Sequence, residues 1–190
     1  MLIYKQNNFL YCFIHIPKTA GKTIRNNIKN KTAVIKEYWG CSDDFDYAHI
    51  SYALRNKFCK YDKVLYHTCV RNPYQRLISS YFYKNPINTI AELRLFIKMV
   101  LKYYDFSNYN YNFIQYYPSY LFICENTLTL PENIIIEKIE DNKNFKINTH
   151  DISIFLDTEC ISIIDKVYAK DFELFNYKNE NNDRNTQLYV

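Results

Sequence analysis

An apolar, β-rich run near the N-terminus, Leu10–Ile16, sets the first limit on the fold. The run ends at a proline and predicts a buried strand, because β-branched and aromatic residues without charges are typical of covered strands. Apolar residues then recur at helical spacing over Thr23–Ile28, which predicts a helix. The same order returns at Lys63–Val70, a second predicted strand that an Asn-Pro pair separates from a helix expected over Tyr74–Tyr83. The chain therefore contains two strand–loop–helix segments.

The rest of the chain alternates strands with helices in the same way. Further strands are expected at Val34–Trp39, Tyr120–Cys124 and Ile134–Ile139, and further helices at Ser51–Phe58, Ile90–Tyr104 and Thr158–Phe175. Ser51 is the expected N-cap of its helix. This alternation predicts an α/β fold with a mainly parallel central sheet flanked by helices. We expect one domain over residues 1–190, with a polar tail after about residue 177.

Composition excludes several classes of protein. Hydrophobic residues make up 48% of the chain and aromatic residues 18%, which excludes wholesale disorder. The only glycines are Gly21 and Gly40, so the three-glycine dinucleotide fingerprint is absent. The 24 basic and 20 acidic side chains leave a net charge of +4, which suits an anionic ligand but does not by itself predict nucleic-acid binding.

Cysteine spacing and hydropathy bear on metals and on location. None of the six cysteines forms a C-x-x-C pair, so no paired-knuckle zinc site is expected, while disulfides stay open. Cys12 and Cys69 lie in apolar runs and are expected to be small buried residues. No stretch approaches the roughly 20 apolar residues of a membrane span, and no secretory signal precedes the first strand. We therefore expect a cytoplasmic protein without a membrane span; its oligomeric state stays open.

The first loop, from His15 to Thr23, joins a strand to a helix and has the composition of an anion site. A helix N-terminus presents unpaired backbone N–H groups and the positive end of the helix dipole. Threonine hydroxyls and a lysine charge would strengthen the hold on an anion, and Gly21 would let the backbone approach closely. The alternative is an ordinary turn with solvated lysines.

The residues Gly21–Thr23 also match the last three positions of a Walker A loop. That motif requires another glycine five positions before Gly21, where Ile16 stands. An ATP-dependent kinase would also need a metal-binding acidic residue after an apolar strand, which Ile134–Ile136 followed by Glu137 imitates only loosely. A P-loop-like small-molecule kinase is therefore the second hypothesis.

The second loop starts at Arg71, where a predicted strand ends, and Ser79 lies two helical turns further along. An arginine can bind a phosphate with both arms of its guanidinium group, and a serine can donate to the same phosphate. Arg76 either supports this site or pairs with an acidic neighbour. Two anion sites at adjacent strand ends predict a ligand with two separated phosphate-like groups.

With these motifs the chain resembles the carbohydrate sulfotransferases that use 3′-phosphoadenosine 5′-phosphosulfate (PAPS), the family 2 group that includes the heparan sulfate 2-O-sulfotransferases. Pro17–Thr23 is similar to the 5′-phosphosulfate loop of that family, and Arg71–Ser79 to its 3′-phosphate motif. Val167–Phe175 matches a family ending, and Ile136–Asp141 faintly resembles another family segment. The resemblance spans residues 10 to 177 and implies a P-loop-NTPase-like sulfotransferase fold.

The resemblance also implies a role for each loop. Lys18 would contact the 5′-phosphate and the bridging oxygen of PAPS, while Arg71 and Ser79 would bind the 3′-phosphate. The 5′-phosphate would be cradled by Thr19, Ala20, Gly21, Lys22 and Thr23. Lys22 departs from the family, which has a small hydroxyl residue there. We also expect no counterpart of the stem, anchor and long acceptor loops of the Golgi members.

Sulfuryl transfer to an alcohol needs a base for the incoming hydroxyl and positive charge beside the leaving phosphate. His49 lies in a Tyr-Ala-His-Ile-Ser-Tyr segment that resembles the His-Val-Ser-Tyr segment carrying the base in 2-O-sulfotransferases. His49 is therefore the expected base, and Lys18 the group that stabilises the leaving phosphate. His15 and His67 fall within predicted strands and are expected to be structural, and His150 is expected at the surface. Lysine, arginine and backbone amides can serve this reaction, so no metal is needed.

The expected function is transfer of a sulfuryl group from PAPS to a hydroxyl of a carbohydrate or glycoconjugate, leaving 3′-phosphoadenosine 5′-phosphate (PAP). The partner is a glycan or small hydroxylated acceptor, which the sequence does not identify further. A third hypothesis is a noncatalytic module that binds anions or nucleic acid, although the basic residues form no dense run and no nucleic-acid partner is expected. The tyrosine-rich segment 103–120 suits either stacking on a ligand or plain packing.

Overall fold

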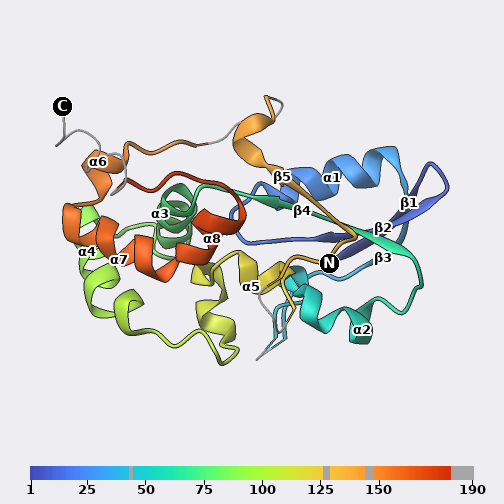
Figure 1. Ribbon diagram of the computed structural model, residues 1–190, viewed down its shortest axis with the longest axis horizontal. Helices are drawn as coiled ribbons and strands as arrows, with labels where there is room; N and C mark the ends of the chain where they lie inside the picture. Colours follow the sequence, from blue (N-terminus) through green and yellow to red (C-terminus); the bar gives the residue numbers. More distant parts are fainter. Residues whose placement is uncertain (43–44, 126–128, 144–147, 181–190) are drawn as a thin grey trace. The chain divides into compact units, whose positions relative to one another are not determined.

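The computed structural model contains an open sheet with the strand order β3-β1-β2-β4-β5 (Figure 1). The structure describes residues 1–42, 45–125, 129–143 and 148–180. The strands are β1 (Leu2–Gln6), β2 (Phe9–Ile14), β3 (Ala33–Glu37), β4 (Val64–Val70) and β5 (Ile134–Lys138). The fold is thus mixed α/β, as the sequence predicts.

The sheet is mixed, so the prediction of a mainly parallel sheet is only half right. β4 runs parallel to both β2 and β5, whereas β1 is antiparallel to both β2 and β3. The antiparallel part follows from the tight turn at Asn7 and Asn8, which both have positive φ (49° and 66°). Two such residues form the hairpin loop that reverses the chain between β1 and β2. Neither β1 nor this hairpin was predicted from the sequence.

The chain packs as two units. The first unit comprises Met1–Arg71, Asn110–Gln115 and Ser119–Ile147, and the second comprises Asn72–Tyr109, Tyr116–Pro118 and Asn148–Val190. The first unit holds the sheet, and the helices α3, α4, α6, α7 and α8 belong to the second.

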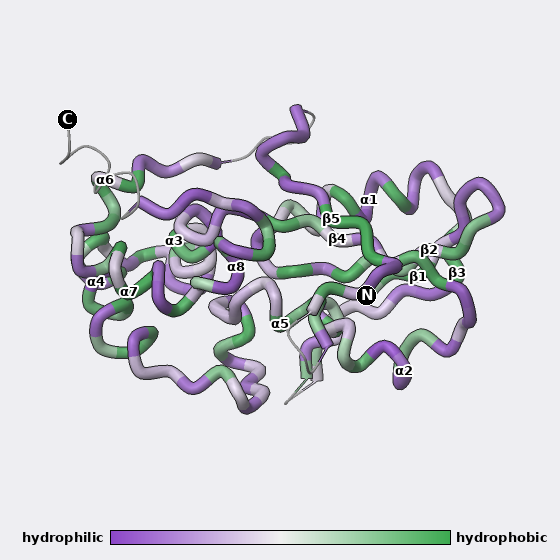
Figure 2. The backbone as a smooth tube through the Cα atoms, in the orientation of Figure 1, coloured by the Kyte–Doolittle hydropathy of each residue, from purple (hydrophilic) through white to green (hydrophobic). Residues whose placement is uncertain are grey.

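In the first unit, α1 (Gly21–Lys31) covers one face of the sheet. Most residues of α1 are hydrophilic, whereas β2 is mostly hydrophobic (Figure 2), so the helix can bury only a narrow stripe. That stripe includes Ile24, which joins a core cluster with Leu2, Tyr4, Phe13, Cys69 and Ile139. Burying a side chain of this size contributes roughly 1.5–3 kcal/mol. The cluster fixes the start of α1 over the ends of the strands.

Short helices cover the opposite face of this sheet. η1 (Tyr47–His49), η2 (Tyr52–Leu54) and α2 (Arg55–Phe58) follow one another in a segment that packs on β4. The rings of Tyr52 and Tyr66 meet edge to face at 4.6 Å between centroids. The predicted helix at Ser51–Phe58 is therefore two short helices, and Ser51 stands at the N-cap position without a side-chain cap bond.

The second unit is helical and well capped. Its helices are α3 (Pro73–Lys84), α4 (Ile90–Met99), α6 (Ile152–Phe155), α7 (Thr158–Val167) and α8 (Ala169–Leu174), with the 3₁₀ turn η3 (Leu101–Tyr103) after α4. Thr89 and Glu92 form a reciprocal capping box at the start of α4. The Nζ atom of Lys98 lies 2.9 Å from Asp157 Oδ2 and ties α4 to the start of α7.

Three further predicted elements differ from the structure. Tyr120–Cys124 was expected as a strand, but it forms the one-turn helix α5 (Tyr120–Ile123), because periodicity cannot distinguish strand from helix in so short an apolar run. The helix expected over Thr158–Phe175 is broken between α7 and α8 at Tyr168, whose buried hydroxyl donates to the carbonyl of Tyr116 at 2.6 Å. The helix expected over Ile90–Tyr104 ends at Met99 and continues as η3.

Among the described residues, no helix has the length and apolar character needed to cross a membrane.

Candidate functional site

The loop between β2 and α1 has an unusual backbone. Lys18 and Ala20 both have positive φ (64° and 58°), a conformation that side chains other than glycine adopt at a cost. Between them, Thr19 is fully buried, and its hydroxyl donates to the carbonyl of Ile16 at 2.9 Å. The loop therefore closes on itself and turns its backbone sharply into α1.

The first turn of α1 carries no cap of its own. Its N-cap residue, Ala20, offers no side-chain acceptor, and no acidic side chain lies in the first turn of this 11-residue helix. The first intrahelical bond described is from the amide of Ile24 to the carbonyl of Ala20, at 3.1 Å. The N–H groups that precede it in a helix have no intrahelical acceptor. Together with the helix dipole they make this helix start suited to an anion.

Gly21, the first residue of α1, is required by a neighbouring ring rather than by its φ angle. A Cβ atom built on Gly21 would lie 1.8 Å from Cδ2 of His15, which is far inside van der Waals contact. His15 itself is only 7% exposed. Gly21 thus makes room for the imidazole of His15. Its expected close backbone approach to a ligand stays a prediction.

Two cations come together at the same loop. Arg71, which directly follows β4, is 5% exposed, and its Nη1 donates to the carbonyl of Lys18 at 3.4 Å. Burial lowers the pKa of Lys18, and the charge of Arg71 lowers it further. Both effects disfavour the charged form of Lys18, because its ammonium group is partly removed from water and is repelled by the positive charge of Arg71. A bound anion would relieve that repulsion.

His49 is the last residue of η1, and its side chain contacts the backbone of the loop at His15. Its Nδ1 is 2.7 Å from the carbonyl oxygen of His15, and the two imidazole centroids are 4.4 Å apart. Since a carbonyl only accepts, Nδ1 of His49 must carry the proton, which leaves Nε2 as the basic nitrogen. That Nε2 is 3.9 Å from Oδ2 of Asp46. Burial lowers the pKa of His49, and the charge of Asp46 acts in the opposite direction.

Three side chains that the sequence analysis did not select also surround His15 and His49. The Trp39 ring is 54% exposed and stacks against His15, with 6.1 Å between ring centroids and 4° between planes. The guanidinium carbon of Arg25 lies 4.4 Å from the centroid of the same indole. Asp46 is the third, because it faces His49. Each comes from a different part of the chain, so no sequence motif marks them.

The structure thus brings Lys18, Arg71 and the start of α1 into one place, and connects His49 to it through His15. Lys22 and Thr23, the last residues of the predicted loop, form the first turn of α1. Ser79 lies on α3, in the second unit, and is half-buried there. Its role beside Arg71 stays a prediction.

Arg76 is buried in the second unit, and its support of an anion site stays a prediction. It is 1% exposed within the second unit, its Nη2 donates to the carbonyl of Tyr117, and its guanidinium lies 5.6 Å from the centroid of Tyr168. Among the described residues Arg76 forms no ion pair with an acidic side chain. Its contact with the tyrosine-rich segment is this buried hydrogen bond to the Tyr117 backbone.

Comparisons of the chain with protein-family models, with curated proteins and with solved structures give no match. The functional assignment therefore depends on the residues of the chain and on the motif resemblance.

Proposed function

We propose that the chain is a sulfotransferase that moves the sulfuryl group of PAPS to a hydroxyl of a carbohydrate or glycoconjugate. The observation that carries the proposal is the meeting of Lys18 and Arg71 at the uncapped start of α1. Backbone amides, a helix dipole and two desolvated cations together favour a ligand that carries phosphate charge. Because Pro17–Thr23 resembles a phosphosulfate loop, PAPS is the ligand that we assign to this site.

Lys18 and the first amides of α1 would act on the leaving group. When the sulfur–oxygen bond to the 5′-phosphate breaks, negative charge grows on the bridging oxygen and the phosphate. Donors already aimed at that position stabilise the charge more in the transition state than in the ground state. Arg71 would hold phosphate charge from the end of β4, with the directed donors of its guanidinium group.

His49 would act as the general base that accepts the proton of the acceptor hydroxyl. Its Nδ1–H is engaged by the carbonyl of His15, so the lone pair on Nε2 is the proton acceptor. Because burial lowers its pKa, His49 is neutral near pH 7, the form that a base requires. Asp46, near Nε2, would stabilise the imidazolium once the proton has been transferred.

The arrangement of β2 and β4 supports the finer assignment to a P-loop-NTPase-like sulfotransferase fold. The two strands are adjacent and parallel, with Ile14 opposite Thr68. Their carboxyl ends therefore deliver Lys18 and Arg71 to one edge of the sheet, the place where open α/β sheets bind ligands.

Ligand choice separates this proposal from a P-loop-like kinase and from a noncatalytic anion-binding module. Thermal unfolding is measured with PAP, with ATP and Mg²⁺, and with a polynucleotide. We expect PAP to stabilise the protein by roughly 2.7 kcal/mol at a hundredfold excess over its dissociation constant. Stabilisation by ATP and Mg²⁺ alone would replace the proposal with the kinase. Binding of polynucleotide with steep salt dependence and no sulfate transfer would favour the module.

Turnover tests the two catalytic assignments. Labelled sulfate transfer is screened over diverse glycans, and then measured for His49→Ala and Lys18→Ala under conditions in which PAP still binds. Loss of the general base should lower the rate by about 10²–10⁴-fold. His150→Ala and Lys36→Ala are the matched controls and should keep the rate. A near-normal rate in His49→Ala would remove His49 from the role of base.

A further inference from the structure

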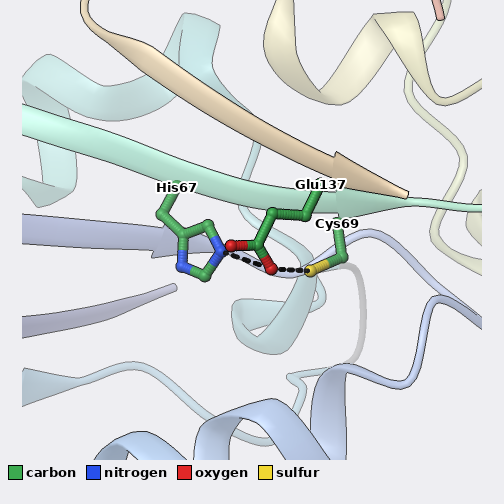
Figure 3. Close-up of side chains that lie close together, drawn as sticks. All are labelled: His67, Cys69 and Glu137. Atoms are coloured by element: carbon green, nitrogen blue, oxygen red, sulfur yellow. Dashed lines mark hydrogen bonds and ion pairs between the residues drawn. The ribbon is translucent and has the colours of Figure 1, made fainter. Parts of the chain in front are cut away.

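A second cluster of chemically active side chains lies on β4 and β5 of the first unit. His67, Cys69 and Glu137 point toward one another from these two strands (Figure 3). The Nε2 atom of His67 is 3.7 Å from Oε2 of Glu137, and Sγ of Cys69 is 4.0 Å from the same oxygen. All three donor atoms lie within 4.8 Å of one another.

The sheet itself holds this cluster in place. His67 and Cys69 are two residues apart on β4, so their side chains project from the same face. Glu137 is paired with Cys69 in the parallel β4–β5 register and projects from that face too. No loop contributes a donor atom. The positions of the three side chains therefore depend on backbone hydrogen bonds that form with the sheet.

The spacing is close to that of a metal centre. A tetrahedral zinc ion with bonds of about 2.0–2.3 Å to nitrogen, oxygen and sulfur holds neighbouring ligand atoms about 3.3–3.7 Å apart. The two distances to the Glu137 carboxylate are at, or a few tenths of an ångström beyond, that range. The third pair, His67 Nε2 and Cys69 Sγ, lies within 4.8 Å, so rotation of the side chains is what would bring the three donors onto one ion.

The surroundings also suit a metal. The Nε2 atom of His67 is buried and, within the described part of the chain, has no hydrogen-bond partner. Cys69 is 1% exposed and belongs to the apolar core cluster, which shields the sulfur from water. The side chain of Glu137 is 50% exposed on β5, an edge strand, which gives an ion a route from solvent.

We propose that His67 Nε2, Cys69 Sγ and the Glu137 carboxylate form a Zn²⁺ site with three protein ligands. A water molecule takes the fourth position on the exposed side of Glu137. Binding displaces the thiol proton of Cys69 to solvent and forms a zinc–thiolate bond, with no change of oxidation state. One sulfur, one nitrogen and one carboxylate oxygen favour Zn²⁺, because Mg²⁺ and Ca²⁺ select all-oxygen sets.

This site does not depend on the proposed sulfotransferase activity. Its ligands are not among the residues assigned to PAPS, and the reaction needs no metal. The site was not predicted from the sequence, because Cys69 belongs to no C-x-x-C pair and His67 was expected to be a structural strand residue. Only the β4–β5 register places Glu137 beside Cys69.

The test uses Co²⁺ and Zn²⁺ added to the full chain in the presence of a non-chelating reductant. We expect one Co²⁺ per chain, with a thiolate-to-cobalt charge-transfer band that Zn²⁺ abolishes by competition. Cys69→Ala should remove the band, and the exposed-cysteine control Cys41→Ser should keep it. Circular dichroism without metal shows whether each variant is folded.

A second variant keeps the test decisive if Cys69→Ala does not fold. Glu137→Gln changes a half-exposed side chain and should weaken Zn²⁺ binding by more than about 10-fold, since even outer-shell changes weaken metal binding by that much. Glu140→Gln is the matched control and should bind normally. Absence of a charge-transfer band in the unmodified chain, or equal affinity in Glu137→Gln and Glu140→Gln, would overturn the proposal. Neither result bears on PAP binding, which is measured separately.

Discussion

The two strand-to-helix junctions of this chain begin their helices in different ways. At the start of α1, Ala20 provides no side-chain cap. At the start of α3, the side chain of Asn72 accepts hydrogen bonds from the amides of Tyr74 and Gln75, at 3.1 and 3.3 Å. The first residue of α3 is Pro73, which has no N–H group to offer. Both helices follow a strand and a loop, but only the start of α3 has a side-chain cap.

The presence or absence of a side-chain cap indicates how an anion would bind at each junction. The start of α1 keeps its amides available, so a phosphate there would be bound by the backbone and by Lys18. The start of α3 has already satisfied its amides with Asn72. An anion at the end of β4 would therefore depend on the side chain of Arg71. The first junction should be sensitive to backbone changes and the second to the loss of one charge.

The largest expected effect is that of Gly21→Ala on the first junction. The added methyl group would collide with the His15 ring, so we expect a loss of about 3 kcal/mol in the free energy of unfolding, the upper end for overpacking. PAP binding should be lost with it. Denaturant unfolding measures the first quantity and calorimetry the second.

Gly40→Ala provides the matched control for that experiment. Gly40 has positive φ (85°) but nothing within 4 Å of a new Cβ atom, so the cost should be about 1 kcal/mol of backbone strain and PAP binding should persist. The double variant His15→Ala/Gly21→Ala should be more stable than Gly21→Ala alone. If the second substitution brings no recovery, the ring contact is not the reason for the glycine.

The next effect concerns the start of α3, which the side chain of Asn72 caps. Asn72→Ala removes the side chain that accepts two amides at the start of α3, and should destabilise the protein by about 1 kcal/mol. Thr89→Ala, which removes the cap of α4, should cost a similar amount. Inorganic phosphate should bind both variants as it binds the unmodified protein. A large loss of phosphate binding in Asn72→Ala would show that the two junctions are not separate in function.

The smallest effect is a change in the pKa of Lys18. Burial is the larger cause of its lowered pKa and Arg71 the smaller, so Arg71→Gln should raise the pKa but leave it below the ordinary 10.5. A lysine with a lowered pKa in the folded state adds stability as the pH rises through that pKa toward the unfolded value. Arg71→Gln should reduce this gain. NMR of the Lys18 side chain measures the pKa directly; an unchanged value would mean that Arg71 does not act on Lys18.

Elements with strong local patterns were predicted correctly, because local residues determine them. β2, β4 and β5 follow from apolar β-rich runs, and α1 and α3 from helical spacing after a loop. The strand Leu2–Gln6 was missed although Asn7 and Asn8 follow it, and asparagine tolerates the positive φ of a hairpin turn. The helix α5 was mistaken for a strand, because one apolar turn has no readable period.

The contacts that shape the candidate sites could not be predicted, because they join residues distant in sequence. The ring of His15 beside Gly21 depends on how β2 enters the loop. Asp46 reaches His49 only through the 3₁₀ turn that it caps. Glu137 meets Cys69 through the pairing of two parallel strands, which the sequence does not specify.

The buried bond between the Thr19 hydroxyl and the Ile16 carbonyl has a consequence for the speed of recognition. It keeps the backbone strain at Lys18 and Ala20 in place before any ligand arrives. The loop is thus preorganised, so an incoming anion need not order a flexible segment of chain when it binds. Association should accordingly be a single diffusive step, with no slow rearrangement of the loop after encounter.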